Sequence, residues 1–250
     1  MKSRVLAVSG RIARQLKGDK RFLGLALGVP LLVVYILRAF MDALPPSARV
    51  FADLDHLGLL ITAFIVHFTA YILCLVVIVR ERREQTLTRM FVNNFRPVEV
   101  IGGYLVGYAV LATVQAALVM GEVCLLFRLS YPPGTVAAIF AVYWLLALIS
   151  IALGMLVSNL ARTEAQIFPF VPLFMLPSVL LSGLVIPVDQ LPWSVRWIAH
   201  VTPFTYALDV LKPLVGQGVA LPDYLAGMAV LAACGAVLLA LAGLTLRERD

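Results

Sequence analysis

The sequence predicts an all-α integral membrane protein with six transmembrane helices. Of its 250 residues, 62% are hydrophobic and 14% are charged, whereas a soluble domain carries about 25% charged residues. The apolar residues come in blocks long enough for a helix to cross a bilayer core, which needs about 20 residues. No stretch alternates like a barrel strand, and a helix satisfies its own backbone hydrogen bonds inside lipid.

The N-terminal segment, residues 1–21, has the sidedness of a helix that lies in the cytoplasmic membrane interface. Its apolar face consists of Val5, Val8, Ile12 and Leu16, and its basic face of Arg11, Arg14, Lys17 and Arg21. A signal peptide is the alternative, but this basic segment is long and several spans follow it. We therefore expect it to be retained as an interfacial amphipathic helix.

The rest of the chain, residues 22–250, is predicted to form one six-span transmembrane domain. The expected spans are residues 22–41, 57–79, 100–127, 136–157, 165–186 and 224–246. Pro169, Pro172 and Pro177 predict kinks in the fifth span, because proline removes a helix donor. Residues 187–221 are semi-polar, and Trp193 and Trp197 suit an outer loop anchored at the interface.

The distribution of basic residues predicts the orientation. Fifteen of the 20 Lys and Arg lie in the N-terminal segment, in residues 80–99, at position 162 and at the C-terminus. The positive-inside rule therefore places both termini and residues 80–99 in the cytoplasm. The net charge of +6 follows this topology, so we expect no nucleic-acid partner and expect membrane lipids around the chain.

Residues 80–99 form a charged island between two long apolar runs. Thr86 is placed to cap a short helix that reaches Asn94, and Pro97 restricts Arg96 to an extended conformation. The pattern predicts a short surface helix carried between two spans. An ordinary topogenic loop is the alternative.

The sequence contains no motif for nucleotide binding or catalysis. None of the four lysines lies in a GxxxxGK[ST] loop, and HExxH, CxxC and GxSxG are absent, so we predict no catalytic residue, metal site or cofactor for this chain. The three cysteines lie in apolar runs without ligand spacing, which favours packing roles. They are Cys74, Cys124 and Cys234.

Only Arg38, His67 and Glu122 are ionisable within the predicted spans. His67 lies mid-span, where an ionisable residue is a functional candidate, although a neutral histidine packed on a neighbouring helix fits as well. Arg38 and Glu122 lie near outer ends, where they can pair or reach the headgroups; a structural role is favoured for all three. Two GxxxG patterns, residues 24–28 and 103–107, permit close helix contact.

Two stretches resemble ABC-2 type transport permeases. The first matches the family's cytoplasmic loop, R-E-x-G-T-L followed by an apolar pair, two prolines and E-x-x-x-G-K. It comprises Arg82-Arg83-Glu84-Gln85-Thr86-Leu87, Met90, Phe91, Pro97, Glu99 and Gly103. Arg83, Gln85, Asn94 and Tyr104 replace the family's glutamate, glycine, first proline and lysine.

The second stretch is similar to the family's P-x-x-x-L-S-G-x-x-x-P, L-P and P-x-T-Y-x-x-D signature. It comprises Pro177, Leu181-Ser182-Gly183, Pro187, Leu191-Pro192-Trp193, Ile198, Pro203, Thr205-Tyr206, Asp209 and Lys212. The resemblance implies short re-entrant helices in the outer leaflet, with an outer gate in place of an ordinary loop. The gate residues are Pro177, Ser182, Gly183, Pro187, Pro192, Pro203, Tyr206 and Asp209.

The resemblance also implies a dimeric permease in the bacterial cytoplasmic membrane. Its partners are a second permease, identical or homologous, and two copies of an ATP-binding cassette subunit that carries ATP and Mg. The short surface helix becomes a coupling helix that docks the cassette subunit. The residues implied for coupling are Arg82, Arg83, Glu84, Thr86, Leu87, Met90, Phe91, Arg96 and Glu99.

Export of an amphiphilic, drug-like or lipid-like substrate is the favoured function, because the spans contain few polar groups for a hydrophilic route. A polysaccharide or glycolipid exporter is the close alternative, since Phe168, Phe170 and Phe174 can stack on sugar rings. A secondary transporter is expected to place several polar or broken-helix sites at midplane, and only His67 is available. A membrane-embedded enzyme lacks a visible acid, base or metal constellation.

Overall fold

The computed structural model describes residues 2–45, 54–127, 129, 131–161, 163–216 and 221–246. Every regular element in these ranges is helical, which confirms the predicted all-α class. The elements are α1 (Lys2–Gly18), α2 (Lys20–Ala43), α4 (Leu54–Arg83), α5 (Thr86–Val92), α6 (Pro97–Leu126), α7 (Pro133–Leu160), η1 (Glu164–Ile167), α8 (Phe170–Leu180), η2 (Val188–Gln190), α9 (Trp193–Val201), α10 (Pro203–Gly216) and α11 (Leu221–Thr245).

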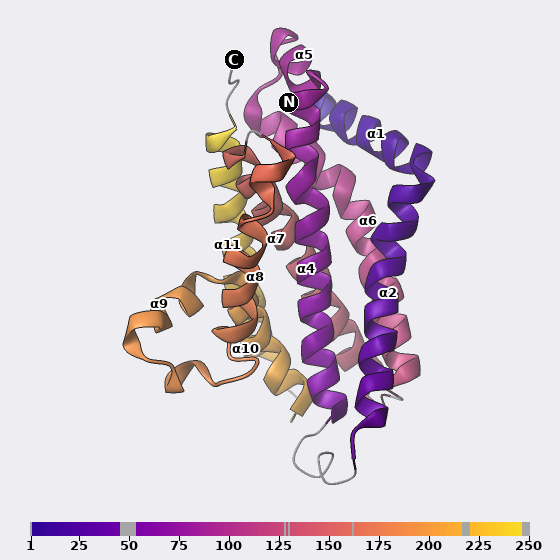
Figure 1. Cartoon of the computed structure of the whole chain (residues 1–250), viewed down its shortest axis with the longest axis vertical. Helices are drawn as coiled ribbons and strands as arrows, with labels where there is room; N and C mark the ends of the chain where they lie inside the picture. The colour runs from indigo at the N-terminus through magenta and orange to yellow at the C-terminus, as the bar shows by residue number, and fades with distance from the viewer. Residues whose placement is uncertain are drawn as a thin grey trace.

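Within the described residues, five helices are long and apolar enough to cross a membrane: α2, α4, α6, α7 and α11. They run along the long axis of the molecule, while α1 lies across the end that carries α5 (Figure 1). The start of α1 and the end of α11 lie at this same end (Figure 1). The chain is therefore a multi-pass membrane protein.

The fifth predicted span, residues 165–186, is not a continuous helix. It begins with the short η1, continues as the 11-residue α8 and loses helical structure after Leu180. Pro169 precedes α8 and Pro177 lies inside it, and each proline lacks the N–H that a longer helix needs. The prolines thus shorten the predicted span to a helix that cannot cross the bilayer alone.

Two half-length helices, α8 and α10, follow one another along the bundle where the fifth span was predicted (Figure 1). Ser178 in the last turns of α8 lies against His67 in the middle of α4, 3.3 Å from its Nε2. Phe204 in the first turn of α10 stacks on the same imidazole. At the other end of α10, the carbonyl of Val215 accepts a hydrogen bond from Tyr131, just before α7. α8 and α10 therefore meet at mid-depth, and η2 and α9 project sideways between them (Figure 1).

The core is centred on α4 and α7, which pack closely along their length. A Cβ added to Gly154 of α7 would lie 2.6 Å from the carbonyl oxygen of Tyr71 in α4, so only glycine allows the two backbones to approach this far. The buried hydroxyl of Tyr143 donates to the carbonyl of Leu59 at 2.6 Å and closes the same pair nearer the opposite end. This pair forms the scaffold on which the other helices rest.

Candidate functional site

The short helix α5 is an independent surface feature carried between α4 and α6. Leu87 and Met90 are buried against the rest of the chain, whereas Arg89 and Val92 are exposed. A seven-residue helix is not stable alone in water, so these buried side chains anchor it. A short helix is present where the sequence predicts one, and Leu87 and Met90, two of the residues implied for coupling, lie on its buried face.

Both ends of the α5 segment contain non-glycine residues in the left-handed region, Gln85 with φ 55° and Asn94 with φ 58°. Gln85 is the N-cap of α5 and makes no side-chain capping bond. The predicted cap at Thr86 is therefore wrong, since Thr86 is the first helical residue. Gln85 replaces the glycine of the permease motif, and the left-handed conformation costs a side chain about 1 kcal/mol.

Arg82 points back into the bundle. Its Nη1 and Nη2 donate to the carbonyl oxygens of Ala161, at 2.9 Å, and Asn159, at 3.3 Å, at the C-terminal end of α7. A cation there satisfies carbonyls that have no partner within the helix. Asn159 in turn donates to the carbonyl of Ala242 in α11 at 2.8 Å. The base of α5 is thus fixed to two spans.

The amphipathic helix α1 packs on α6 along the second GxxxG pattern. A Cβ added to Gly103 would overlap the side chain of Val8, and one added to Gly107 would lie 2.8 Å from the Cβ of Ile12. The apolar face of α1 therefore contacts protein, while its basic side remains largely exposed. The first pattern, Gly24 to Gly28, has no described heavy atom within 4 Å of either added Cβ, so it makes no helix contact within the described part of this chain.

Two ion pairs link α1 to the segments on either side of α5. Arg4 lies 3.5 Å from the Oε2 of Glu99 and also donates to the carbonyl of Asn94. Arg11 lies 3.1 Å from the Oε2 of Glu81, and its guanidinium also donates to the hydroxyl of Tyr104. The two carboxylates are each only 3% exposed. Glu99, predicted to contact a docked subunit, is thus directed toward α1.

The electrostatics of Arg11 agree with this pairing. Burial lowers the pKa of its guanidinium, but Tyr104 and the Glu81 carboxylate outweigh that effect and raise the pKa above its ordinary value. Arg11 and Glu81 were not predicted from the sequence to be partners. The available signal was a carboxylate at the end of a span, one turn beyond its apolar run, on the side of the membrane where the basic helix α1 lies.

The other residues predicted for coupling remain at the surface or beside it. Arg83, Glu84 and Arg96 are exposed, and Thr86 and Phe91 are half-buried. Arg96 is extended, with φ −84° and ψ 147°, as Pro97 predicts. Its backbone N–H donates to Glu99 at 2.9 Å, which fixes the start of α6.

The prolines of the second motif begin helices. Pro187 and Pro192 are the N-caps of η2 and α9, and Pro203 is the first residue of α10. Proline suits these positions because the N–H it lacks has no partner in the first turn. Pro177 differs, since it lies inside α8. Three of the four prolines therefore set where the short helices start.

The Ser182-Gly183 pair forms the turn after α8. Gly183 has φ 89°, a conformation that only glycine adopts without strain, and its carbonyl accepts a hydrogen bond from Lys212 of α10. The buried hydroxyl of Ser182 has no hydrogen-bond partner among the described residues. Tyr206 donates to the carbonyl of His200 at 2.6 Å and fastens α9 to α10, while Asp209 is exposed.

His67 joins four helices at mid-depth. Its Nδ1 lies 2.7 Å from the hydroxyl of Ser150 in α7, and its Nε2 lies 3.3 Å from that of Ser178 in α8. The ring is fully buried and parallel to Phe204 of α10, with centroids 5.7 Å apart. A packed histidine was one of the two interpretations of the sequence. Neither serine was predicted as its partner, although each is a polar residue inside an apolar run.

Arg38 does not pair with Glu122. Its guanidinium contacts Asp42 and Asp55, at 2.9 Å each, and lies over the ring of Phe127. The Oε2 of Glu122 has no hydrogen-bond partner in the described part of the chain. The two acidic partners flank the loop between α2 and α4, so Arg38 pairs with residues near it in the sequence, and of the two alternatives considered the pair with Glu122 does not form.

Comparison with known proteins identifies the family. Residues 4–213, most of the chain, match the family described as ABC-2 type transporter. The chain belongs to this family. Among similar proteins is the probable multidrug ABC transporter permease YbhR of Escherichia coli K12, which is 28% identical over 137 residues, 55% of this chain and 37% of YbhR.

Two further relatives of this ABC-2 chain come from other bacteria. The linearmycin resistance permease protein LnrN of Bacillus subtilis is 25% identical over 168 residues, 67% of this chain and 41% of LnrN. Nodulation protein J of Rhizobium leguminosarum is 37% identical over 70 residues, 28% of this chain and 27% of that protein. The chain thus spans less than half the length of these relatives.

Proposed function

We propose that this ABC-2 chain is the permease subunit of an ATP-driven exporter that moves an amphiphilic, drug-like or lipid-like substrate out of the cell. The observation that supports it most is α5, a short helix presented at one end by two long spans and anchored by buried Leu87 and Met90. The sequence has no phosphate-binding loop, so the energy comes from a separate ATP-binding cassette subunit that holds ATP and Mg.

In this proposal the α5 end faces the cytoplasm, as the surplus of basic residues there favours. Two permease chains, identical or homologous, each receive one cassette subunit on the exposed face of α5. Arg89 and Val92 lie on that face, so they replace Leu87 and Met90 as the expected docking contacts.

The anchors of α5 then transmit movement into the membrane. Leu87 and Met90 fix it to the bundle, and Arg82 fixes its base to the end of α7. Arg4 and Arg11 connect the same region to α1 through Glu99 and Glu81. A displacement of α5 therefore acts on α1, α4, α6 and α7 together.

The cargo assignment is supported by the scarcity of charge in the spans. Arg38 pairs at the outer end of its helix, and His67 is buried within its own chain. Neither side chain therefore lines a hydrophilic path for a substrate. Two relatives carry the words multidrug and linearmycin resistance in their names, which agrees with an amphiphilic cargo. The broken crossing at α8 and α10 supplies a place where the wall can move.

Two alternatives are weaker. Phe168 is exposed beside α8, which keeps open a polysaccharide or glycolipid exporter that stacks sugar rings. A broken crossing beside His67 is a feature of secondary transporters, but the groups there are a neutral pair of serines bonded to their own helices. Such a site offers no coupling-ion ligand set.

Co-purification with the cassette subunit tests the docking surface. We expect Arg89→Glu and Val92→Asp to abolish retention of the cassette subunit or to lower the ATPase rate of the complex about thirtyfold, because hot-spot contacts contribute on the order of 2 kcal/mol. Arg14→Glu, an equal charge reversal at an exposed site on α1, is the control. Normal assembly, ATPase activity and transport by both α5 variants would refute the docking assignment.

A stimulation screen tests the cargo. In liposomes that contain the assembled complex, amphiphilic drugs or lipids are expected to raise the ATPase rate. Stimulation by glycan carriers alone would transfer the proposal to the polysaccharide and glycolipid class.

A further inference from the structure

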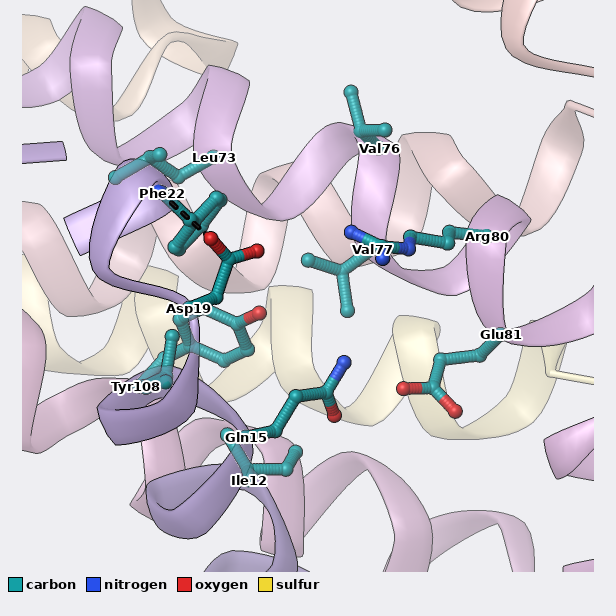
Figure 2. Close-up of a pocket in the computed structure, with 11 residues that line it drawn as sticks. Ile12, Gln15, Asp19, Phe22, Leu73, Val76, Val77, Arg80, Glu81 and Tyr108 are labelled. Carbon is teal, nitrogen blue, oxygen red and sulfur yellow. Dashed lines mark hydrogen bonds between the residues drawn. The ribbon is translucent and has the colours of Figure 1, made fainter. Parts of the chain in front are cut away.

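A pocket lies where α1, the first turn of α2, α4 and α6 meet, at the end of the molecule that carries α5 (Figure 2). Its volume is about 60 Å³, and most of its lining residues come from α1 and α4. Arg80 at its mouth is in the last turn of α4, which places the pocket at the level of the membrane surface. Neither docking at α5 nor the junction at His67 uses it.

One face of α4 lines this pocket, and its side chains change from charged to apolar with depth. Leu73, Val76, Val77 and Arg80 all line it, and their spacing of three or four residues places them on one side of the helix. The cation is at the membrane surface, and the apolar residues lie one and two turns deeper. Phe22 of α2 lines the pocket opposite them. The wall thus changes from charged to apolar over the depth at which a lipid does.

Polar groups of opposite charge point into the mouth of the pocket (Figure 2). Asp19 uses its Oδ1 to accept the N–H of Phe22 at 3.0 Å, and the side chain of Arg80 binds only Glu84, through its Nε, at 3.0 Å. Among the described residues, the Oδ2 of Asp19, both Nη atoms of Arg80 and the amide of Gln15 have no hydrogen-bond partner. Asp19 and Arg80 are close enough to interact electrostatically.

We propose that this pocket binds one phospholipid with a zwitterionic, primary-ammonium headgroup. The Nη atoms of Arg80 bind the phosphate, and Asp19 with Gln15 accepts hydrogen bonds from the ammonium group. One acyl chain runs along Val76, Val77 and Leu73 toward the membrane interior. Arg80 suits this role because a guanidinium binds phosphate through paired donors.

The charges around the pocket select against other lipids. Asp19 and Glu81 both line it, and Glu81 is already paired with Arg11, so a lipid with a net negative charge meets an unneutralised carboxylate. A quaternary ammonium headgroup has no N–H to donate to Asp19. Charge complementarity therefore favours an ethanolamine-type headgroup over glycerol or choline types.

A lipid in this position contacts α1, α2 and α4 at once. It fills the wedge beside the Arg11 and Glu81 pair and couples the amphipathic helix to the span that leads into α5. The assignment does not depend on the identity of the exported cargo, because it concerns a bound lipid of the surrounding bilayer.

Native mass spectrometry of the full complex, released from nanodiscs that contain equal parts of phosphatidylethanolamine, phosphatidylglycerol and phosphatidylcholine, tests the proposal. We expect one phosphatidylethanolamine per chain to remain bound. Arg80→Gln and Asp19→Asn are each expected to weaken its retention about tenfold, since a charge-assisted hydrogen bond contributes about 1.5 kcal/mol or more. Asparagine caps a helix as well as aspartate does, so the second variant retains the start of α2.

Matched controls separate the site from general lipid contact. Arg14→Gln removes an equal charge from an exposed site on α1 that does not line the pocket, and it should leave retention unchanged. Val76→Phe, at a 37% exposed position in the wall, should block the acyl chain, whereas Val106→Phe on the lipid face of α6 should not.

Three results would overturn the proposal. They are equal retention of phosphatidylglycerol or phosphatidylcholine, equal losses with Arg14→Gln and Arg80→Gln, and full retention by Val76→Phe. Binding of a lipophilic cation such as tetraphenylphosphonium at the pocket, with no phosphatidylethanolamine retained in its absence, would instead make the pocket a cargo site.

Discussion

Two junctions hold this protein together, and they differ in chemistry. Where α1 meets α6 and α4, glycines bring the backbones together and buried carboxylates pair with arginines. Where α8 meets α10, a buried histidine lies within hydrogen-bond distance of two serine hydroxyls and stacks on a phenylalanine. Breaking an ion pair with a buried member is costly, whereas exchanging neutral hydrogen bonds costs about 1 kcal/mol. We therefore expect the α1 junction to resist opening more strongly than the junction of α8 and α10.

Widening the α1 junction should give the largest effect on stability. Gly103→Leu places a side chain in the space that Val8 already fills, and overpacking of this kind costs up to about 3 kcal/mol. We expect a clear fall in thermal midpoint in detergent, with α1 becoming sensitive to protease. Gly24→Leu, which has no described neighbour, is the control, and an equal fall in both variants would argue against a glycine-dependent contact.

Removing one charge from the same junction should cost less. Arg11→Gln leaves Glu81 buried without its cation, and because Arg11 is 31% exposed we expect a loss of about 2 kcal/mol rather than the larger value of a fully buried pair. The double variant Arg11→Gln with Glu81→Gln should recover most of the loss. A double-mutant cycle on the thermal midpoint measures this, and strictly additive losses would show that the two residues are not coupled.

Altering the His67 junction should affect stability least and transport more. His67→Leu removes the ring's contacts with two serine hydroxyls. Ser150 and Ser178 donate to the carbonyls of Leu146 and Phe174, at 2.6 and 2.8 Å, so a neutral ring with one N–H donates to only one of them. We expect a cost of about 1 kcal/mol and faster hydrogen exchange in residues 177–205. His56→Leu is the control. Unchanged exchange, or unfolding as severe as that of Gly103→Leu, would remove the contrast between the two junctions.

The sequence predicted the membrane class, the five long apolar helices and the short helix between α4 and α6, because each depends on local composition. It did not predict that residues 165–186 break into η1 and α8, since their apolar composition resembles that of a span. Three prolines were the available sign, and only the packing of Ser178 and Phe204 on His67 shows that α8 and α10 meet at mid-depth.

The candidate site was predictable in position but not in the direction of its side chains. Residues 80–99 marked α5 correctly, yet Leu87 points inward and Arg82 caps α7. A seven-residue helix has about two turns, so a shift of its start by one residue changes which side chains are buried. The ion pairs of Arg4 and Arg11 could not be predicted from the sequence, because each joins segments that lie far apart in it.

The break of residues 165–186 into η1 and α8 also affects how the protein enters the membrane. η1 and α8 are too short and too rich in proline to insert as an independent span, because their backbone groups would lack partners in lipid. α8 bonds to α4 through Tyr71 and His67, and Lys212 of α10 closes the turn at Gly183. α8 and α10 must therefore assemble against α4, which is synthesised before them.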